Sequence, residues 1–259
     1  MTFHLVKLDS KLNPTEEVPR LVSVDVSRDV TDDVPLLESC SVEVDCDTVT
    51  DLTGWARIEW RDGSLYQLGT FRLELSSTTW EQGHATAKLK GYSVLKPADE
   101  VTLTAGSFAR AGIDGVAYVR ELLSVCPSRI VAQGSAQVPE NVVHDDDASY
   151  LEAAWDVLDA MGWRIRLDGD GTINLEPLPT EPSIEISQYS AHGVQDGIDI
   201  DGEEVSYTRE FLGTVFPGDI VRLSVPQAGI DVTKRVTSQD LECGEGCTVE
   251  ETLGEWERG

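Results

Sequence analysis

The sequence has few basic residues and no long apolar run. Its 259 residues include 20 Lys and Arg against 47 Asp and Glu, a formal net charge of −27. Such a chain repels nucleic acid and anionic membranes, so ordinary DNA or RNA binding is not expected. No apolar run approaches the roughly 18 residues of a membrane span, so no membrane insertion is expected. The N-terminus lacks the basic start, apolar core and cleavage site of a signal peptide.

The excess of acid has two interpretations that the sequence leaves open. It can keep the surface soluble, including at high salt. It can also line a surface past which another polyanion must slide. The hydrophobic fraction of 40% is sufficient for a packed core, so the chain is not expected to be disordered.

The five cysteines form no strong metal-binding spacing. Cys40 and Cys46 share one strand face with two valines, which is typical of small buried apolar residues. Cys126 ends a helical run, and Cys243 and Cys247 flank Gly-Glu-Gly at a possible hairpin tip. A cross-turn disulfide or half a zinc site stays open there. Reduced thiols in a protein assembled inside the cell are favoured.

A long antiparallel hairpin over residues 68–98 sets the pattern of the chain. Apolar and polar residues alternate from Thr70 to Ser76, and the alternation resumes after His84. A turn is predicted at Trp80-Glu81-Gln82-Gly83. The residues expected to point inward are Phe71, Leu73, Leu75, Ala85, Ala87 and Leu89.

Further strands are predicted on both sides of this hairpin. The first ends at Asn13-Pro14, and the others cover 22–26, 39–45 and 55–60, with Val22, Val24 and Val26 facing inward in the second. About six strands with short polar turns favour a small closed or nearly closed antiparallel barrel. We therefore expect an N-terminal β-barrel domain over 1–105.

The next segment, 106–180, has a different pattern and is predicted as an α+β domain. A helix is expected over 112–126, and a second helix over 149–161 packs on a hairpin. Ser149 and Glu152 form a capping box for the second helix, and Gly162 suits its C-terminal end. Trp163 to Leu167 then alternates, with Arg164 and Arg166 on the polar side.

The remaining segment, 181–259, is predicted as a C-terminal β-barrel domain. Gly193 to Asp201 is interpreted as a loop, and strands are expected over 205–211, 221–225, 232–241 and 248–253. The predicted fold class is mainly β with a small α+β insertion, built from antiparallel β-barrel domains.

Known catalytic motifs are absent from the sequence, which has no nucleophile elbow, no H-E-x-x-H and no phosphate-binding glycine loop. Cys126 and His144 as nucleophile and base are less favoured than a core cysteine. Asp145 to Asp147 fit helix-end electrostatics better than a cation site, and Asp168-Gly-Asp-Gly fits a turn. The scattered histidines are His4, His84, His144 and His192. No catalytic, cofactor-binding or metal-binding residue is expected, although a glycosidase carboxylate pair is not excluded.

Three stretches resemble tail hub and baseplate hub proteins of bacteriophages and contractile injection particles. They are Gln67-Leu68-Gly69-Thr70-Phe71 with the Trp80 turn and Gly91-Tyr92-Ser93-Val94-Leu95-Lys96-Pro97-Ala98, the helix and hairpin of 150–177, and Phe216-Pro217-Gly218-Asp219 with its following strand. The resemblance implies a non-enzymatic, structural virion protein of the tail, assembled in the host cytoplasm. It implies a homotrimer whose barrels build a ring between the tail tube protein and a spike or fibre protein. DNA would pass through that ring without specific binding, and its acidic residues would line the inner surface.

Two other functions remain open at this point. A tail-tip module for carbohydrate would use exposed aromatics such as Trp55, Trp80 or Trp256. A tail-associated cell-wall hydrolase is the third possibility. Trp80 and Trp256 are also candidates for subunit interfaces, or for covers over a barrel end.

Overall fold

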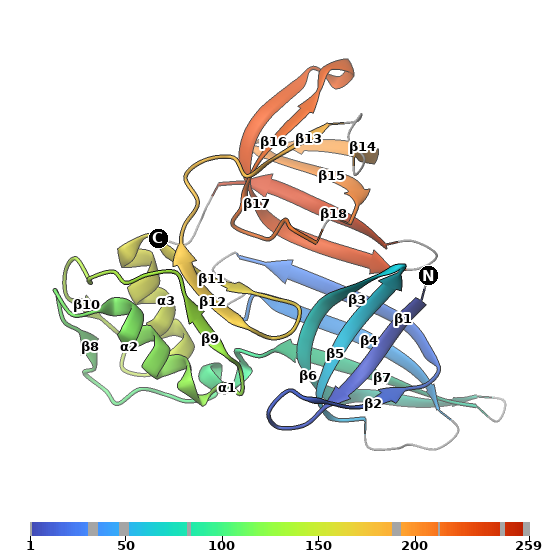
Figure 1. Cartoon of the computed structure of the whole chain (residues 1–259), viewed down its shortest axis with the longest axis horizontal. Helices are drawn as coiled ribbons and strands as arrows, with labels where there is room; N and C mark the ends of the chain where they lie inside the picture. Colours follow the sequence, from blue (N-terminus) through green and yellow to red (C-terminus); the bar gives the residue numbers. More distant parts are fainter. Residues whose placement is uncertain are drawn as a thin grey trace.

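The computed structural model describes residues 2–30, 36–46, 52–81, 84–187, 193–211, 213–243 and 247–255. Three parts follow one another along the chain (Figure 1): a lower right sheet, a helical unit on the left and an upper sheet. Gln82 and Gly83 of the predicted turn, His192 and Trp256 lie outside the described residues.

The elements of the three parts, in chain order, are as follows. The N-terminal part holds β1 (Thr2–Leu8), β2 (Pro14–Val18), β3 (Leu21–Asp29), β4 (Glu38–Cys46), β5 (Gly54–Asp62), β6 (Ser64–Glu81) and β7 (His84–Ser93). The middle part holds α1 (Lys96–Asp99), β8 (Phe108–Ala109), α2 (Gly115–Leu122), the 3-10 turn η1 (Leu123–Val125), β9 (Ile130–Ala132), β10 (Val142–Val143), α3 (Tyr150–Met161), β11 (Trp163–Leu167) and β12 (Ile173–Pro177). The C-terminal part holds β13 (Ile184–Ser187), β14 (Val194–Asp201), β15 (Glu204–Glu210), β16 (Ile220–Val225), η2 (Pro226–Ala228), β17 (Ile230–Cys243) and β18 (Cys247–Gly254).

Strands of the N-terminal and C-terminal parts form one 13-stranded sheet. Its main order is β14-β15-β18-β17-β3-β4-β7-β6-β5-β1-β2, with β16 on β17 and β13 on β16. All these pairs are antiparallel except that of β13 with β16. The predicted mainly β, antiparallel class with an α+β insertion is confirmed. In the described residues the main path is open, since no pairing joins β14 to β2.

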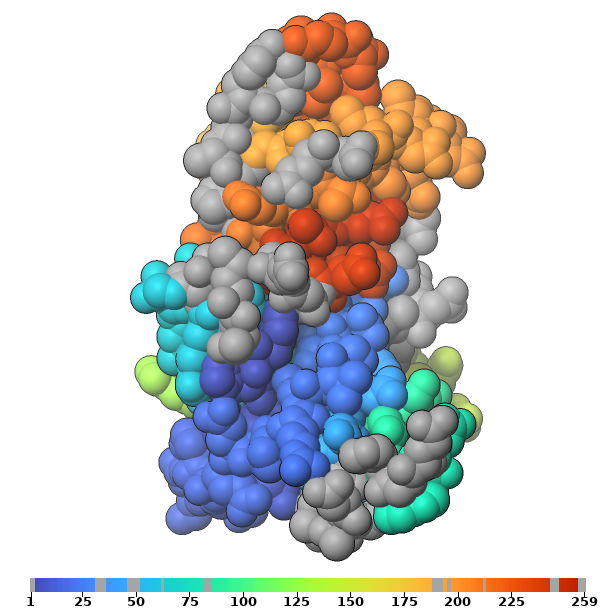
Figure 2. Space-filling view, turned by 90° about the vertical axis from the view of Figure 1, so that its right-hand side faces the viewer, coloured from blue at the N-terminus to red at the C-terminus, as the bar shows by residue number. Residues whose placement is uncertain are grey.

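The long strand β17 joins the two sheet regions. Ile230 to Arg235 pairs with β16, and Ser238 to Glu242 pairs with β3. A register shift between Val236 and Ser238 in its pairing with β18 marks the change of neighbour. Figure 2 shows the molecule from the side, with C-terminal residues in orange and red lying above N-terminal residues in blue.

Three apolar cores lie along the molecule. One fills the middle part, a second lies in the N-terminal sheet, and a third lies in the C-terminal sheet. The second core also takes Phe211, Leu241, Cys247 and Val249 from the C-terminal part. The division at 105 and 180 therefore stays a prediction, because β17 and β18 contribute to two cores.

The middle part follows its predicted local signals closely. Ser149 accepts the amide of Glu152, the Glu152 carboxylate accepts the amide of Ser149, and Gly162 ends α3 at φ 67°. Figure 1 shows α2 and α3 on the outer side of the β9–β11–β12 sheet. Because capping and amphipathic spacing act over a few residues, the sequence alone was sufficient to place this helix.

Two residues predicted to face inward are exposed, for different reasons. Val22 is 58% exposed because the pairing of β3 with β4 shifts between Leu21 and Ser23. A bulge adds one residue to a strand and breaks the alternation of faces. Leu75 is opposite the buried Leu89, so it lies on the predicted side, but it is 46% exposed at a point where the pairing of β6 with β5 has already ended, at Leu73.

Three other strand predictions differ from the structure in extent. Trp80 lies within β6, opposite Ala85, so the turn is shorter than predicted. Pro14 begins β2, and the predicted loop from 193 to 201 holds β14. In β14 two register shifts at its start interrupt the alternation that identifies strands in a sequence.

Candidate functional site

A polar, acidic face covers the joined sheet from β14 to β4. In an antiparallel pair, directly opposed residues point to the same side. The registers place these side chains on one face: Asp199, Ser206, Thr208, Glu210, Thr248, Glu250, Thr252, Ser238, Asp240, Glu242, Asp25, Ser27, Ser39, Ser41 and Glu43. We call this set the acidic face. It is continuous because β17 and β3 pair across the two sheet regions.

Like charges stand directly opposite one another at the centre of the acidic face. Asp25 is opposite Glu242 in the β3–β17 pair, and Asp240 is opposite Glu250 in the β17–β18 pair. All four side chains are exposed. Opposed like charges in a sheet are destabilising, so folding alone does not favour this arrangement. These residues also line a hollow of about 250 Å³ together with Thr208 and Thr248.

The other side of the same strands carries a buried polar network. Arg209 donates to Glu251 at 2.8 Å, Tyr207 donates to Glu251 at 2.6 Å, and Gln239 donates to Glu251 at 2.6 Å. Arg28 of β3 donates to the Gln239 side chain at 3.3 Å. Burial raises the pKa of Tyr207, and the nearby Glu251 carboxylate raises it further. The network links strands of both sheet regions beneath the acidic face.

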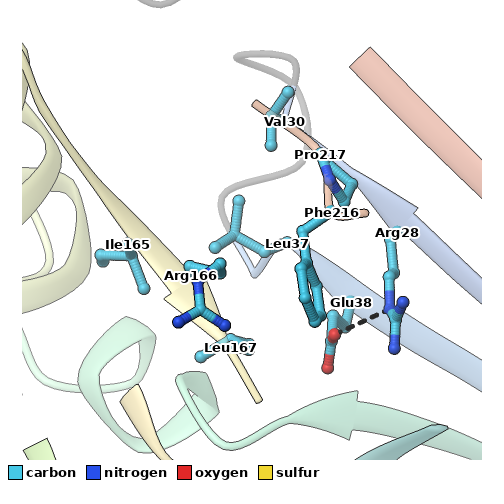
Figure 3. A pocket seen from close by; sticks show the side chains of 9 residues that line it. All are labelled: Arg28, Val30, Leu37, Glu38, Ile165, Arg166, Leu167, Phe216 and Pro217. Carbon is cyan, nitrogen blue, oxygen red and sulfur yellow. Dashed lines mark hydrogen bonds and ion pairs between the residues drawn. The ribbon is translucent and has the colours of Figure 1, made fainter. Parts of the chain in front are cut away.

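The network continues to the point where the three parts meet. Arg28 donates to Glu38 at 3.0 Å, and its guanidinium lies 5.4 Å from the centre of the Phe216 ring. Arg166 of β11 lies 5.0 Å from the same centre. Figure 3 shows these residues around a cavity of about 20 Å³, lined also by Pro217. Phe216 thus packs between cations of the N-terminal and middle parts.

The turn 216–219 is fixed by further ionic contacts. Asp219 pairs with Arg164 at 2.6 Å, and Arg164 also pairs with Glu176 at 2.7 Å. Arg164 lies on the polar face of β11, opposite Glu176, as the alternation predicted, but this face is buried, since Arg164 is only 3% exposed. The C-terminal turn covers that face of β11, which no local pattern in the sequence indicates.

The buried Glu38 carboxyl also lies at this junction. Burial raises its pKa to about 7, an effect that Arg28 partly offsets and the Asp168 charge increases. A carboxyl group with this pKa changes charge near neutral pH.

One signal in the sequence could have revealed the network. Val205, Tyr207 and Arg209 alternate on the inward side of one strand, as do Val249, Glu251 and Leu253 on another. A cation and an anion at inward positions of two strands indicate a buried ion pair. That Arg28 and Gln239 join it depends on the β3–β17 pairing, which the sequence does not show.

Cys126 and His144, considered above as a nucleophile and a base, each have a structural role. Cys126 is buried, and burial raises its pKa to about 11. His144 is 3% exposed, lies 2.8 Å from Asp156 and 3.2 Å from the Tyr118 hydroxyl, and stacks on the Tyr118 ring. His4 lies 2.5 Å from Glu17 at the β1–β2 pair.

The cysteines with open alternatives are partly placed. Cys40 is buried, as predicted, and the side chain of Cys46 lies outside the described residues. Cys243 and Cys247 are opposite one another at the end of the β17–β18 pair. Cys247 is buried, and the side chain of Cys243 is not among those described.

The carboxylates of the Asp168–Asp170 turn, considered above for a cation, form local hydrogen bonds and an ion pair. Asp168 accepts from Asn174 at 2.8 Å and pairs with Arg166, and Asp170 accepts the amide of Thr172 at 2.8 Å. The turn interpretation is therefore confirmed. Within the described ranges, no group of three or more His, Cys, Asp or Glu side chains could hold a metal ion. Helices long and apolar enough to cross a membrane are likewise absent from the described part.

The two described tryptophans named for binding differ sharply. Trp55 is half-buried and packs against the core of the middle part. Trp80 is 64% exposed near the end of the β6–β7 hairpin. Of these two, only Trp80 is largely exposed.

No protein-family model and no curated protein sequence matches this chain. Solved structures do match it. A tail protein from Neisseria meningitidis has a TM-score of 0.72 at 12% identity, covering 100% of this chain and 99% of its own. A 43 kDa tail protein of prophage MuSo2 from Shewanella oneidensis has a TM-score of 0.66 at 7% identity, covering 99% of both chains. A prophage tail protein from Listeria monocytogenes has a TM-score of 0.62 at 10% identity, covering 100% of this chain and 96% of its own. The resemblance to phage tail proteins is thus confirmed for the fold, over the whole chain.

Proposed function

We propose that this chain is a structural protein of a phage tail, acting as a tail hub or baseplate component. Three copies form a ring that joins the tail tube protein to a spike or fibre protein at the tail tip. The protein assembles in the host cytoplasm, stays in the virion tail and catalyses no reaction. The fold that it shares with three tail proteins over at least 96% of each of their chains supports this assignment.

The acidic face is the observation that carries the proposal. It places Asp25, Asp240, Glu242 and Glu250 together at an energetic cost to the folded chain. In a ring, this face lines the passage. Phosphate groups of DNA are not bound there because the residues of the acidic face include no Lys or Arg to replace their counterions. DNA then moves through without being held.

The junction around Phe216 supports the same function mechanically. A ring component between two partners transmits force across its domains. Cation–π contacts from Arg28 and Arg166, with ionic contacts to Asp219, hold the three parts together. We propose the division into an N-terminal β-barrel domain (1–105), a middle α+β domain (106–180) and a C-terminal β-barrel domain (181–259) as parts of this one body.

The mass of the protein in solution, alone and with a tail-tube protein, tests the proposal. We expect a trimer, formed either alone or on the tube. Density for the assembly should place Asp240 and Glu242 on the passage. A strict monomer that ignores the tube protein, or an acidic face on the outside of the ring, would contradict it. Clearing of peptidoglycan by the purified protein would favour the hydrolase alternative.

A further inference from the structure

A pair of exposed apolar side chains lies on the two-stranded β8–β10 sheet of the middle part. Phe108 of β8 is opposite Val143 of β10, so both side chains point to the same side of this sheet. They are 53% and 76% exposed. On the other side, Ala109 is buried and Val142 packs on the core of the middle part. The sheet thus has apolar side chains on both sides, and the described chain covers one of them.

Val143 also lines a hollow of about 320 Å³, which we call the α3 hollow. Its lining residues are Val143, Asp145, Asp147, Ala148, Glu152 and Asp156. Two of the four carboxylates are held in place: Asp156 lies 2.8 Å from Nδ1 of His144, and Glu152 accepts the amide of Ser149 at 2.6 Å. Groups that are already ordered lose little freedom when a cation binds them.

The charges around the apolar pair decide which cation fits. Within the described ranges, no group of three or more carboxylates, His or Cys could hold a metal ion, so the α3 hollow does not suit a bare metal. Separate carboxylates suit Lys and Arg side chains, each of which can reach one of them. Because β8 and β10 are antiparallel, the exposed Arg110 lies at the end of the pair away from the α3 hollow. The charge therefore changes sign along this surface, and only one end matches a cation.

We propose that this surface binds a segment of another protein in which an apolar side chain stands beside a cluster of Lys or Arg. The apolar side chain packs on Phe108 and Val143, and the cations pair with carboxylates of the α3 hollow. A second copy is a poor source of such a segment, because this chain has 20 basic against 47 acidic residues. Figure 1 shows β8 and β10 at the left edge, on the side of the middle part away from the joined sheet. The surface is thus separate from the acidic face, and the inference does not depend on the ring.

A labelled peptide with one Trp beside three Lys probes the surface of the full chain, with fluorescence anisotropy as the readout. We expect saturable binding to the wild type. D145N/D147N should weaken it about fivefold, since two exposed ion pairs are lost. The matched control, D240N/E250Q, removes two charges from the acidic face and should leave the affinity unchanged.

F108S separates the apolar contact from the overall charge. It keeps the net charge and should weaken peptide binding about tenfold. Its thermal unfolding temperature should not change, because Phe108 is mostly exposed. V22S is its matched control, since it removes an exposed apolar side chain from β3, and it should bind as the wild type does.

Three results would overturn the proposal. They are equal affinities of the wild type, F108S and D145N/D147N, no binding up to about 1 mM peptide, and a lower oligomeric mass of F108S alone, which would identify a second copy as the occupant. The ring is tested separately, by the mass of the wild-type protein.

Discussion

Neutralising the opposed carboxylates of the acidic face should stabilise this protein. D25N removes the repulsion between Asp25 and Glu242, and D240N removes that between Asp240 and Glu250. Each opposed pair costs about 0.2–1 kcal/mol in a sheet. The double variant should therefore gain about 1 kcal/mol of unfolding free energy. For a chain of this size, ~1 kcal/mol raises the unfolding temperature by about 2–4 °C.

Thermal unfolding at low and high salt is the measurement. Salt shortens the Debye length to about 3 Å at 1 M, so the gain should largely disappear there. E43Q is the matched control, because Glu43 lies on the same face but 3.7 Å from Lys88. It should give no gain. Equal stability of wild type and double variant at low salt, or a gain that salt does not reduce, would refute the reasoning.

Variants of the acidic face also test whether its destabilising carboxylates serve DNA passage. If the acidic face lines the passage, the double variant should still assemble into tails. D240K in place of D240N should slow DNA release, because a cation on the passage binds phosphates. Normal DNA release from particles that carry D240K would show that the acidic face plays no part in DNA passage.

Three further predictions concern the buried groups. Burial raises the pKa of the Glu38 carboxyl to about 7, so the folded state keeps a proton that the unfolded state loses above pH 4.5. The stabilisation from this bound proton is full below pH 4.5 and is lost as pH rises through 7, by at most about 1.4 kcal/mol per pH unit. E38Q should remove this pH dependence of the unfolding free energy, measured by urea unfolding. Replacing Glu251 by Gln leaves the fully buried Arg209 uncompensated and should cost about 3–5 kcal/mol in the same assay, while a loss below 1 kcal/mol would contradict the buried pair. At Gly169 a Cβ atom would lie 1.8 Å from the Gln67 carbonyl oxygen, so G169A should lower the unfolding temperature, and an unchanged value would show that the turn after β11 separates freely from β6.

The middle part shows how far local signals reach. The capping box at Ser149, the C-terminal Gly162 and the Asp168 turn were predicted and found because each depends on hydrogen bonds within a few residues. Strand alternation likewise identified most of β3 to β7 and β15 to β18. It failed at Val22, where a bulge shifts the register and nothing local in the sequence marks the extra residue.

The candidate site was predictable only as a property of the whole chain. The net charge of −27 indicated a surface that avoids phosphates, and the resemblance to tail hub proteins suggested where such a surface would be used. Which carboxylates share a face depends on the pairing of β17 with β3. These strands are some 200 residues apart, and neither carries a mark of its partner.

The sequence by itself determined the classes of element, the helix ends and the sign of the surface, because propensity, capping and charge belong to single residues and their near neighbours. The tertiary structure alone decided that two sheet regions become one, that Arg28, Arg164 and Arg209 are buried, and that Trp80 stays exposed. Burial of a cation depends on which distant carboxylate or ring lies over it. Exposure of an aromatic side chain depends on whether a distant part of the chain covers it.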